Sequence, residues 1–125
     1  MITSAVVTGA CGFIGSHLAE ELVHRGTHVK ALAFYDARGS QGWLGALPKD
    51  VSDSMEIISG DVRDVEQMRR IVSAEDTVFH LAALIGIPYS YQAPRSYVET
   101  NINGTINMLE AVRAASFYKT PEAIE

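Results

Sequence analysis

The stretch Thr8-Gly9-Ala10-Cys11-Gly12-Phe13-Ile14-Gly15 lies between an apolar run that ends at Val7 and an amphipathic run that begins at Phe13. Its pattern predicts a strand, a tight glycine turn and the first turn of a helix. Gly9 would let the chain reverse direction, Gly12 would let the backbone approach a ligand closely, and Gly15 would let the helix lie against the strand. The unpaired N–H groups at such a helix start, together with the helix dipole, favour an anion.

The segments that follow the glycine turn predict that it lies within a βαβ unit. Residues 13–25 are amphipathic with a four-residue apolar spacing, which predicts a helix that Gly26 ends. Residues 28–34 are a second apolar run, so the two runs and the helix make a βαβ unit. Such a turn can also be an ordinary strand-to-helix connection. Within a βαβ unit it predicts that a dinucleotide pyrophosphate contacts Gly9, Cys11, Gly12, Phe13, Ile14 and Gly15.

Further strands and loops are expected along the chain. Apolar runs at residues 55–59 and 76–83 predict two more parallel strands. Long loops are expected at 35–53, with one helical turn near Trp43, and at 84–92.

Two further helices are expected. Asp64 and Gln67 have the spacing of a capping box at the start of a short helix, with Val65, Met68 and Val72 on its buried side. A longer helix over residues 94–115 carries an apolar stripe. No fifth strand follows to cover this stripe, so we expect its side chains to be partly exposed: Val98, Ile102, Leu109 and Val112.

The pattern as a whole predicts an α/β fold, a Rossmann-type doubly wound parallel sheet that is incomplete at its C-terminal end. Residues 1–115 would form this partial dinucleotide-binding domain, and residues 116–125 would be a tail or junction of unclear structure.

The composition argues against several classes of function. The 125 residues are 47% hydrophobic and 20% charged, which indicates a folded domain, and the net charge of -5 argues against nucleic acid as a partner. No apolar run approaches the length of about 20 residues that a membrane span needs. The single cysteine excludes an intrachain disulfide, and no Cys/His spacing indicates a metal site. We expect a cytoplasmic protein without a bound metal.

Four motifs together resemble the N-terminal half of an extended short-chain dehydrogenase/reductase. Residues 8–15 are similar to the glycine loop of that family, and 60–64, Gly-Asp-Val-Arg-Asp, to its adenine-pocket motif. Residues 80–83, His-Leu-Ala-Ala, resemble the segment beside the nicotinamide, and 101–105, Asn-Ile-Asn-Gly-Thr, the asparagine motif of its fourth helix. The resemblance implies a nucleotide-sugar substrate and a homodimer of the full-length protein.

Within the family, residues 33–44 and the 84–91 loop look most like sugar-nucleotide 4,6-dehydratases, especially the bacterial UDP-N-acetylglucosamine type. That resemblance implies oxidation at C4 of the sugar, loss of water across C5 and C6, and return of the hydride to C6. The family uses a Tyr-x-x-x-Lys pair for this chemistry, and no tyrosine of this sequence has a lysine four residues later. We therefore assign no catalytic residue and expect no turnover by this chain alone. The alternatives are an epimerase or reductase of the same family and a non-catalytic dinucleotide-sensing module.

The resemblance also implies cofactor contacts outside the glycine loop: Asp61, Val62, Leu81, Ala82, Ala83 and Asn101. Asp61 would accept the adenine amino group, although it could also cap a helix or lie at the surface. The two alanines would leave room for a flat ring or would simply pack tightly. Asn101 would bridge a helix kink and an active-site water, or its amide would face solvent.

The choice between NAD and NADP is open. Phe34 stands near the position where an acidic residue would bind the ribose 2′-hydroxyl. Arg38 and Ser40 could hold a 2′-phosphate, whereas Asp36 could bind a free diol.

Five side chains have two interpretations each. Cys11 is either a redox thiol at a helix start or a small space-filling residue. His80 is either a general base or a structural histidine that orients the alanines after it. Trp43 could cover the adenosine or pack on the core, and Tyr89 with Tyr91 could line a sugar pocket or cover the end of the sheet.

Overall fold

The computed structural model describes residues 1–74 and 76–117, and its chain divides into two compact units. The first unit comprises Met1–Asp61 and the described part of Glu75–Ala82. The second comprises Val62–Ala74 and the described part of Ala83–Glu125. The sheet and the glycine turn belong to the first unit.

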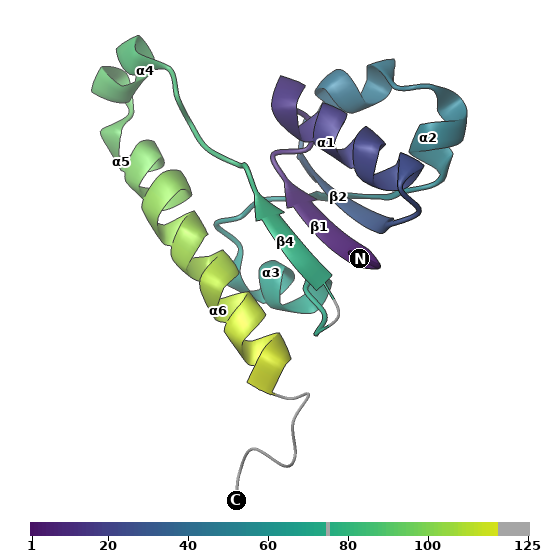
Figure 1. The fold of residues 1–125 in the computed structure, drawn as a ribbon. Helices are drawn as coiled ribbons and strands as arrows, with labels where there is room; N and C mark the ends of the chain where they lie inside the picture. The colour runs from purple at the N-terminus through teal and green to yellow at the C-terminus, as the bar shows by residue number, and fades with distance from the viewer. Residues whose placement is uncertain (75, 118–125) are drawn as a thin grey trace, which may run out of the picture. The chain divides into compact units, whose positions relative to one another are not determined.

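The first unit is built on a four-stranded parallel sheet with the order β3-β2-β1-β4 (Figure 1). Its strands are β1 (Ser4–Thr8), β2 (His28–Phe34), β3 (Glu56–Gly60) and β4 (Asp76–His80). All four predicted strands are confirmed, and β2 has the predicted bounds. This order places β1, which leads into the glycine turn, between β2 and β4, as in a Rossmann-type sheet.

Three helices accompany this sheet: α1 (Phe13–His24), the 3-10 helix η1 (Gly42–Ala46) and α2 (Lys49–Asp53). The predicted helical turn near Trp43 is η1, but the rest of the expected 35–53 loop is not all loop, because it contains α2. A five-residue helix is too short to show a helical period in the sequence. The core of the unit consists of small and branched side chains: Ala5, Val7, Ala19, Leu22, Val29, Ala31, Leu44 and Val51.

A buried ion pair links the strands of this sheet. Lys30 Nζ on β2 lies 2.9 Å from Asp76 Oδ2 on β4, and Ser4 on β1 donates its hydroxyl to the same carboxylate. The Asp76 side chain is fully buried. Because removing one partner would leave a buried charge uncompensated, this trio strongly favours the observed pairing of the strands.

The end of β4 is fixed by the hydroxyl of Thr8, which is fully buried. Thr8 Oγ1 accepts the N–H groups of Leu81 and Ala82, at 3.0 and 3.1 Å, and lies 2.8 Å from His80 Nδ1. The two accepted bonds occupy both lone pairs, so the hydroxyl proton is donated to Nδ1 and His80 is neutral with its proton on Nε2. These contacts support the structural interpretation of His80.

The second unit contains α3 (Val65–Ile71), α4 (Ile87–Gln92), α5 (Pro94–Tyr97), the π-helical η2 (Val98–Asn103) and α6 (Gly104–Phe117). The predicted cap of α3 is confirmed, since Asp64 accepts the N–H of Gln67 at 3.0 Å. The expected 84–92 loop is wrong in part, because α4 occupies most of it. The predicted helix over 94–115 forms with a π-helical insertion and extends to Phe117. Residues 118–125, most of the predicted tail, lie outside the described residues.

Helices α3 and α6 pack on each other within this unit. Met68, Val72, Met108 and Ala111 are buried, whereas Val65 is 38% exposed and does not belong to the buried side as predicted. The expected partial exposure of the apolar stripe is confirmed. Its members are between 37% and 65% exposed: Val98, Ile102, Leu109 and Val112.

Acid is expected to destabilise the first unit through His80. Burial holds the pKa of His80 below its ordinary value, so the unfolded chain takes up the proton at a higher pH than the folded chain does. The destabilisation by His80 is therefore absent above about pH 6.5. Below this pH, the free energy of unfolding falls as the pH decreases toward the pKa of His80 in the folded chain. The slope from one proton cannot exceed about 1.4 kcal/mol per pH unit. Urea unfolding at a series of pH values measures it.

The matched control is His80→Asn, which keeps an acceptor near Thr8 but does not titrate. The part of the slope that comes from His80 should disappear in this variant below about pH 6.5. An unchanged slope would show that His80 is not the group responsible.

Candidate functional site

The glycine turn contains one residue with left-handed backbone angles and one close backbone approach. Gly9 has φ +67°, so the reversal of the chain predicted there is confirmed. A Cβ on Gly15 would lie 2.2 Å from the Gly9 carbonyl oxygen. The sequence predicts that the missing side chain of Gly15 lets the helix lie against the strand. In the structure the nearest atoms belong to Gly9 and Ala10, so Gly15 lets the helix lie against the glycine turn.

Gly12 differs from these two glycines, because nothing in its own geometry requires glycine. Its φ of -77° and ψ of 170° are extended values that any residue adopts. A Cβ at this position would meet only the Gly9 carbonyl, at 3.3 Å. Gly12 is also the N-cap residue of α1, where no side chain caps the helix and no acidic residue occupies the first turn. The helix start therefore presents backbone N–H groups, next to a position where a side chain is missing.

The segment after β4 lies directly against the turn. A Cβ on Gly9 would come within 2.8 Å of the Ala82 nitrogen and of the Leu81 carbonyl carbon. The Thr8 hydroxyl already holds both residues by their N–H groups. The structure thus brings Leu81 and Ala82 beside Gly9, as the resemblance implied. Ala83 belongs to the second unit.

Cys11 connects the turn to the end of β2. Burial raises the pKa of its thiol, and a smaller effect from a backbone hydrogen bond with Phe34 lowers it. A thiol with a raised pKa is less often the reactive thiolate, so the space-filling interpretation is supported over the redox one. The side chains of Phe13 and Ile14 project outward and are 59% and 71% exposed, so only their backbones face the turn's interior.

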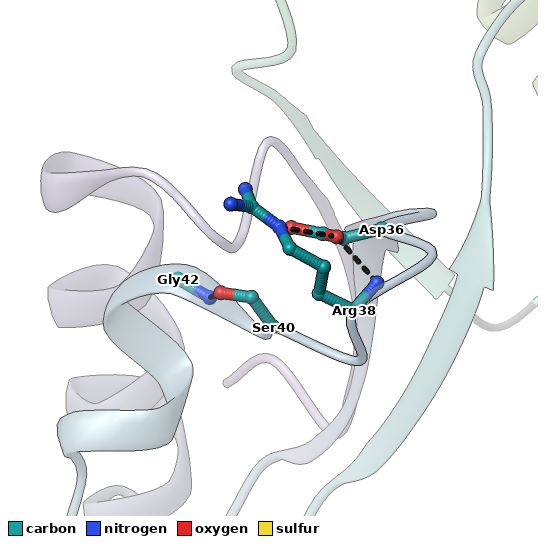
Figure 2. Close-up of polar contacts among 4 residues, drawn as sticks. All are labelled: Asp36, Arg38, Ser40 and Gly42. Atoms are coloured by element: carbon teal, nitrogen blue, oxygen red, sulfur yellow. Dashed lines mark hydrogen bonds and ion pairs between the residues drawn. The ribbon is translucent and has the colours of Figure 1, made fainter.

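The loop after β2 holds the candidates for cofactor choice (Figure 2). The carboxylate of Asp36 accepts the backbone N–H of Arg38 at 2.8 Å and lies 3.4 Å from the Arg38 Nε. The Ser40 hydroxyl accepts the N–H of Gly42 at 3.2 Å. Arg38 is therefore turned onto Asp36, while its side chain remains 90% exposed. Both interpretations of this loop, a diol on Asp36 and a 2′-phosphate on Arg38 and Ser40, stay predictions.

Asn101 lies in the π-helical turn of the second unit, where its amide makes two hydrogen bonds to one residue. Its Nδ2 donates to the Leu84 carbonyl and its Oδ1 accepts the Leu84 N–H, both at 2.8 Å. The structure has a π-helical turn where a kink is expected, and the two bonds to Leu84 contradict the alternative of an amide that only faces solvent. Asn101 thereby fixes the chain immediately after Ala83. The active-site water stays a prediction.

The other candidate residues lie in ordinary surroundings. Val62 is buried, its methyl group would be 2.7 Å from a Cβ on Gly104, and its carbonyl accepts the amide of Asn107 at 2.9 Å. Asp61 follows β3 and is partly exposed, and its role as an adenine partner stays a prediction. Tyr89 packs near Tyr97, with ring centroids 6.1 Å apart.

The described residues contain neither a candidate metal cluster nor a candidate membrane-spanning helix. Among residues 1–74 and 76–117, no three His, Cys, Asp or Glu side chains gather as metal ligands. No helix in that part of the chain is long and apolar enough to cross a bilayer.

The roles of two residues that contact the turn or hold its neighbours do not follow from the motif. The Thr8 hydroxyl is one, although a polar residue at the end of a buried strand is a signal that a partner is present. Gly42 is the other, because it falls in the segment expected to be a loop, and a single sequence carries no sign of what it approaches.

Comparison with known proteins gives a consistent result. A family model described as GDP-mannose 4,6 dehydratase matches residues 6–123. The UDP-N-acetyl-alpha-D-glucosaminuronate decarboxylase of Bacillus cytotoxicus is 37% identical over 107 residues, which cover 85% of this chain and 32% of that protein. UDP-glucuronate 4-epimerase 5 of Arabidopsis thaliana is 34% identical over 119 residues, 90% of this chain and 27% of that protein.

A solved structure agrees with these relatives. The UDP-glucose-4-epimerase of Stenotrophomonas maltophila, determined with bound NAD and formylated UDP-arabinopyranose, superposes with a TM-score of 0.69 at 27% identity. The match covers 92% of this chain and 34% of that one, so the chain spans about a third or less of these relatives' lengths. Sequence motifs, sheet order, glycine turn and comparisons agree that the chain belongs to the GDP-mannose 4,6-dehydratase family, within the NAD-dependent epimerase/dehydratases of the extended short-chain dehydrogenase/reductase group.

Proposed function

We propose that this chain is the nicotinamide-dinucleotide-binding part of a sugar-nucleotide 4,6-dehydratase. The observation that supports the dinucleotide site is the start of α1 at Gly12. No side chain caps this helix start, and the glycine has no side chain that would keep a ligand away from the backbone N–H groups. A pyrophosphate there would be bound by the helix start without a charged side chain. The Leu81–Ala82 backbone, held against Gly9, would form the neighbouring wall.

The reaction of the full-length protein is the finer part of the proposal. Oxidation at C4 of the sugar, loss of water across C5 and C6, and hydride return to C6 would use a Tyr-x-x-x-Lys pair that this sequence does not contain. The curated relatives named above are a decarboxylase and an epimerase, which favours a second candidate, a sugar-nucleotide epimerase. A non-catalytic dinucleotide-sensing module is the third.

Partners and location complete the proposal. We infer a homodimer of the full-length protein from its resemblance to the family. Sedimentation velocity of the full-length protein tests this, and a monomer at micromolar concentration would contradict it. A cytoplasmic location agrees with a single cysteine that cannot form an intrachain disulfide.

The product mass separates the candidate reactions. Full-length protein incubated with UDP-N-acetylglucosamine and the cofactor should yield a nucleotide sugar that has lost one water, measured by mass spectrometry. A product of unchanged mass but different stereochemistry would indicate the epimerase instead. The 125-residue chain alone should yield neither product, because the Tyr-x-x-x-Lys pair is absent from it.

Gly12→Val should abolish dinucleotide binding, because the added side chain would fill the space that the phosphates need. The helix content should stay nearly intact, since valine adopts the extended angles of Gly12 and its Cβ requires only a small shift of the Gly9 carbonyl, 3.3 Å away. Calorimetry with NAD and NADP measures the affinity, and far-UV circular dichroism measures the helix content.

Gly45→Val is the matched control, because a Cβ at Gly45 would meet nothing within 4 Å. This variant should bind as the unaltered chain does. Unchanged affinity in Gly12→Val would contradict the proposed phosphate site.

Arg38→Ala tests the cofactor choice. If Arg38 binds a 2′-phosphate, its loss should weaken NADP by the equivalent of about 1.5–3 kcal/mol, the usual contribution of a hydrogen bond to a charged group. NAD should be affected little, because the exposed Arg38–Asp36 pair itself contributes little. Equal losses of affinity for both dinucleotides would show that Arg38 does not distinguish them.

A further inference from the structure

One segment outside the predicted site lies on the glycine turn. Residues 42–44, which we call the strap, follow the Asp36–Arg38 turn and lie in η1. The Trp43 N–H donates to the Cys11 carbonyl at 2.9 Å, so the strap is hydrogen-bonded to the residue just before Gly12. The fully buried Leu44 anchors the strap in the core of the first unit.

The strap can reach the turn only because Gly42 has no side chain. Gly42 has φ +55°, and a Cβ there would lie 2.6 Å from the Cys11 carbonyl oxygen and 3.1 Å from the Cys11 Cβ. Gly39 also has left-handed angles, with φ +76°, but a Cβ on it would meet nothing within 4 Å. The close approach to Cys11 is therefore particular to Gly42, because Gly39, outside the strap, has similar backbone angles without such a contact.

The Trp43 ring adds a second contact at the start of α1. It meets the Phe13 ring edge-on, with centroids 5.1 Å apart and an interplanar angle of 77°. The His17 ring lies against the same Phe13 at 4.5 Å. Trp43 neither packs in the core nor lies free, since half of it is exposed. The strap thus touches Cys11 and Phe13, the two neighbours of Gly12.

We propose that the strap holds the glycine turn in its binding shape, and that Gly42 and Trp43 are positioning residues for dinucleotide binding. This inference rests on the proposed function. Another part of the turn is already fixed, because Leu81 and Ala82 lie against Gly9. With the strap in place on Cys11, the backbone groups around Gly12 are ordered before the ligand arrives. Binding then incurs a smaller loss of conformational freedom, so affinity depends on residues that touch no phosphate.

The experiment compares Gly42→Ala with Gly39→Ala and Gly45→Ala in the full 125-residue chain, using calorimetry with NAD and, separately, NADP. Gly42→Ala should weaken binding about tenfold or more, because its Cβ would displace the strap from Cys11. Gly39→Ala shares the unfavourable φ but not the contact, and Gly45→Ala shares neither. Both controls should stay within about twofold of the unaltered chain.

Trp43 is the single tryptophan, so its fluorescence reports the strap directly. In free Gly42→Ala the emission should shift to the red, because the indole moves from Phe13 into water. Saturating NAD should reverse part of this shift, because binding and strap closure favour each other. A merely destabilised protein would show the shift without the reversal.

A second pair of variants decides the matter if Gly42→Ala does not fold. Trp43→Ala should weaken binding, and Trp43→Phe, which keeps an aromatic edge on Phe13, should restore most of it. Wild-type affinity in a folded Gly42→Ala, or equal affinity in the two Trp43 variants, would overturn the role of the strap. If the unaltered chain bound neither NAD nor NADP, the proposed function would fall instead.

Discussion

Two backbone segments lie so close to Gly9 that neither Gly9 nor Gly15 could carry a side chain without a clash. On one side are Leu81 and Ala82, 2.8 Å from the position that a Gly9 Cβ would take. On the other is Gly15, whose own missing Cβ would stand 2.2 Å from the Gly9 carbonyl. The turn, the end of β4 and the first turn of α1 are therefore packed together as backbone against backbone.

Much of this arrangement could be predicted from the sequence, because its causes are local. The mostly apolar residues 28–34 predicted the bounds of β2, and the spacing of Asp64 and Gln67 predicted the cap of α3. The three glycines of residues 9–15 indicated a close approach of backbone, since few other roles require so many residues without side chains. The family motifs then indicated a dinucleotide as the class of ligand.

What could not be predicted depends on contacts between distant residues. The 3-10 helix at Gly42 and the five-residue α2 are too short for a period to show. Gly42 meets Cys11, 31 positions earlier, and the partner of Gly15 is the turn and not the strand. Lys30 and Asp76 form their buried pair across β1, which only the strand order makes possible. Phosphate binding itself is a property of a complex, so neither the sequence nor the free chain displays it.

The double hydrogen bond of Asn101 has a consequence for the length of the helix that carries it. An amide that both donates to and accepts from Leu84 acts as a neighbouring peptide group would, and a carboxylate could not replace it because it lacks the donor. The π-helical turn at Val98–Asn103 amounts to one residue more than an α-helix needs. Removing one residue there would let an ordinary helix close while rotating Asn101 away from Leu84. The number of residues between Pro94 and Gly104 is therefore fixed by the bond of Asn101 to Leu84. Insertions or deletions in this stretch would break that bond, even where the helix itself could accommodate them.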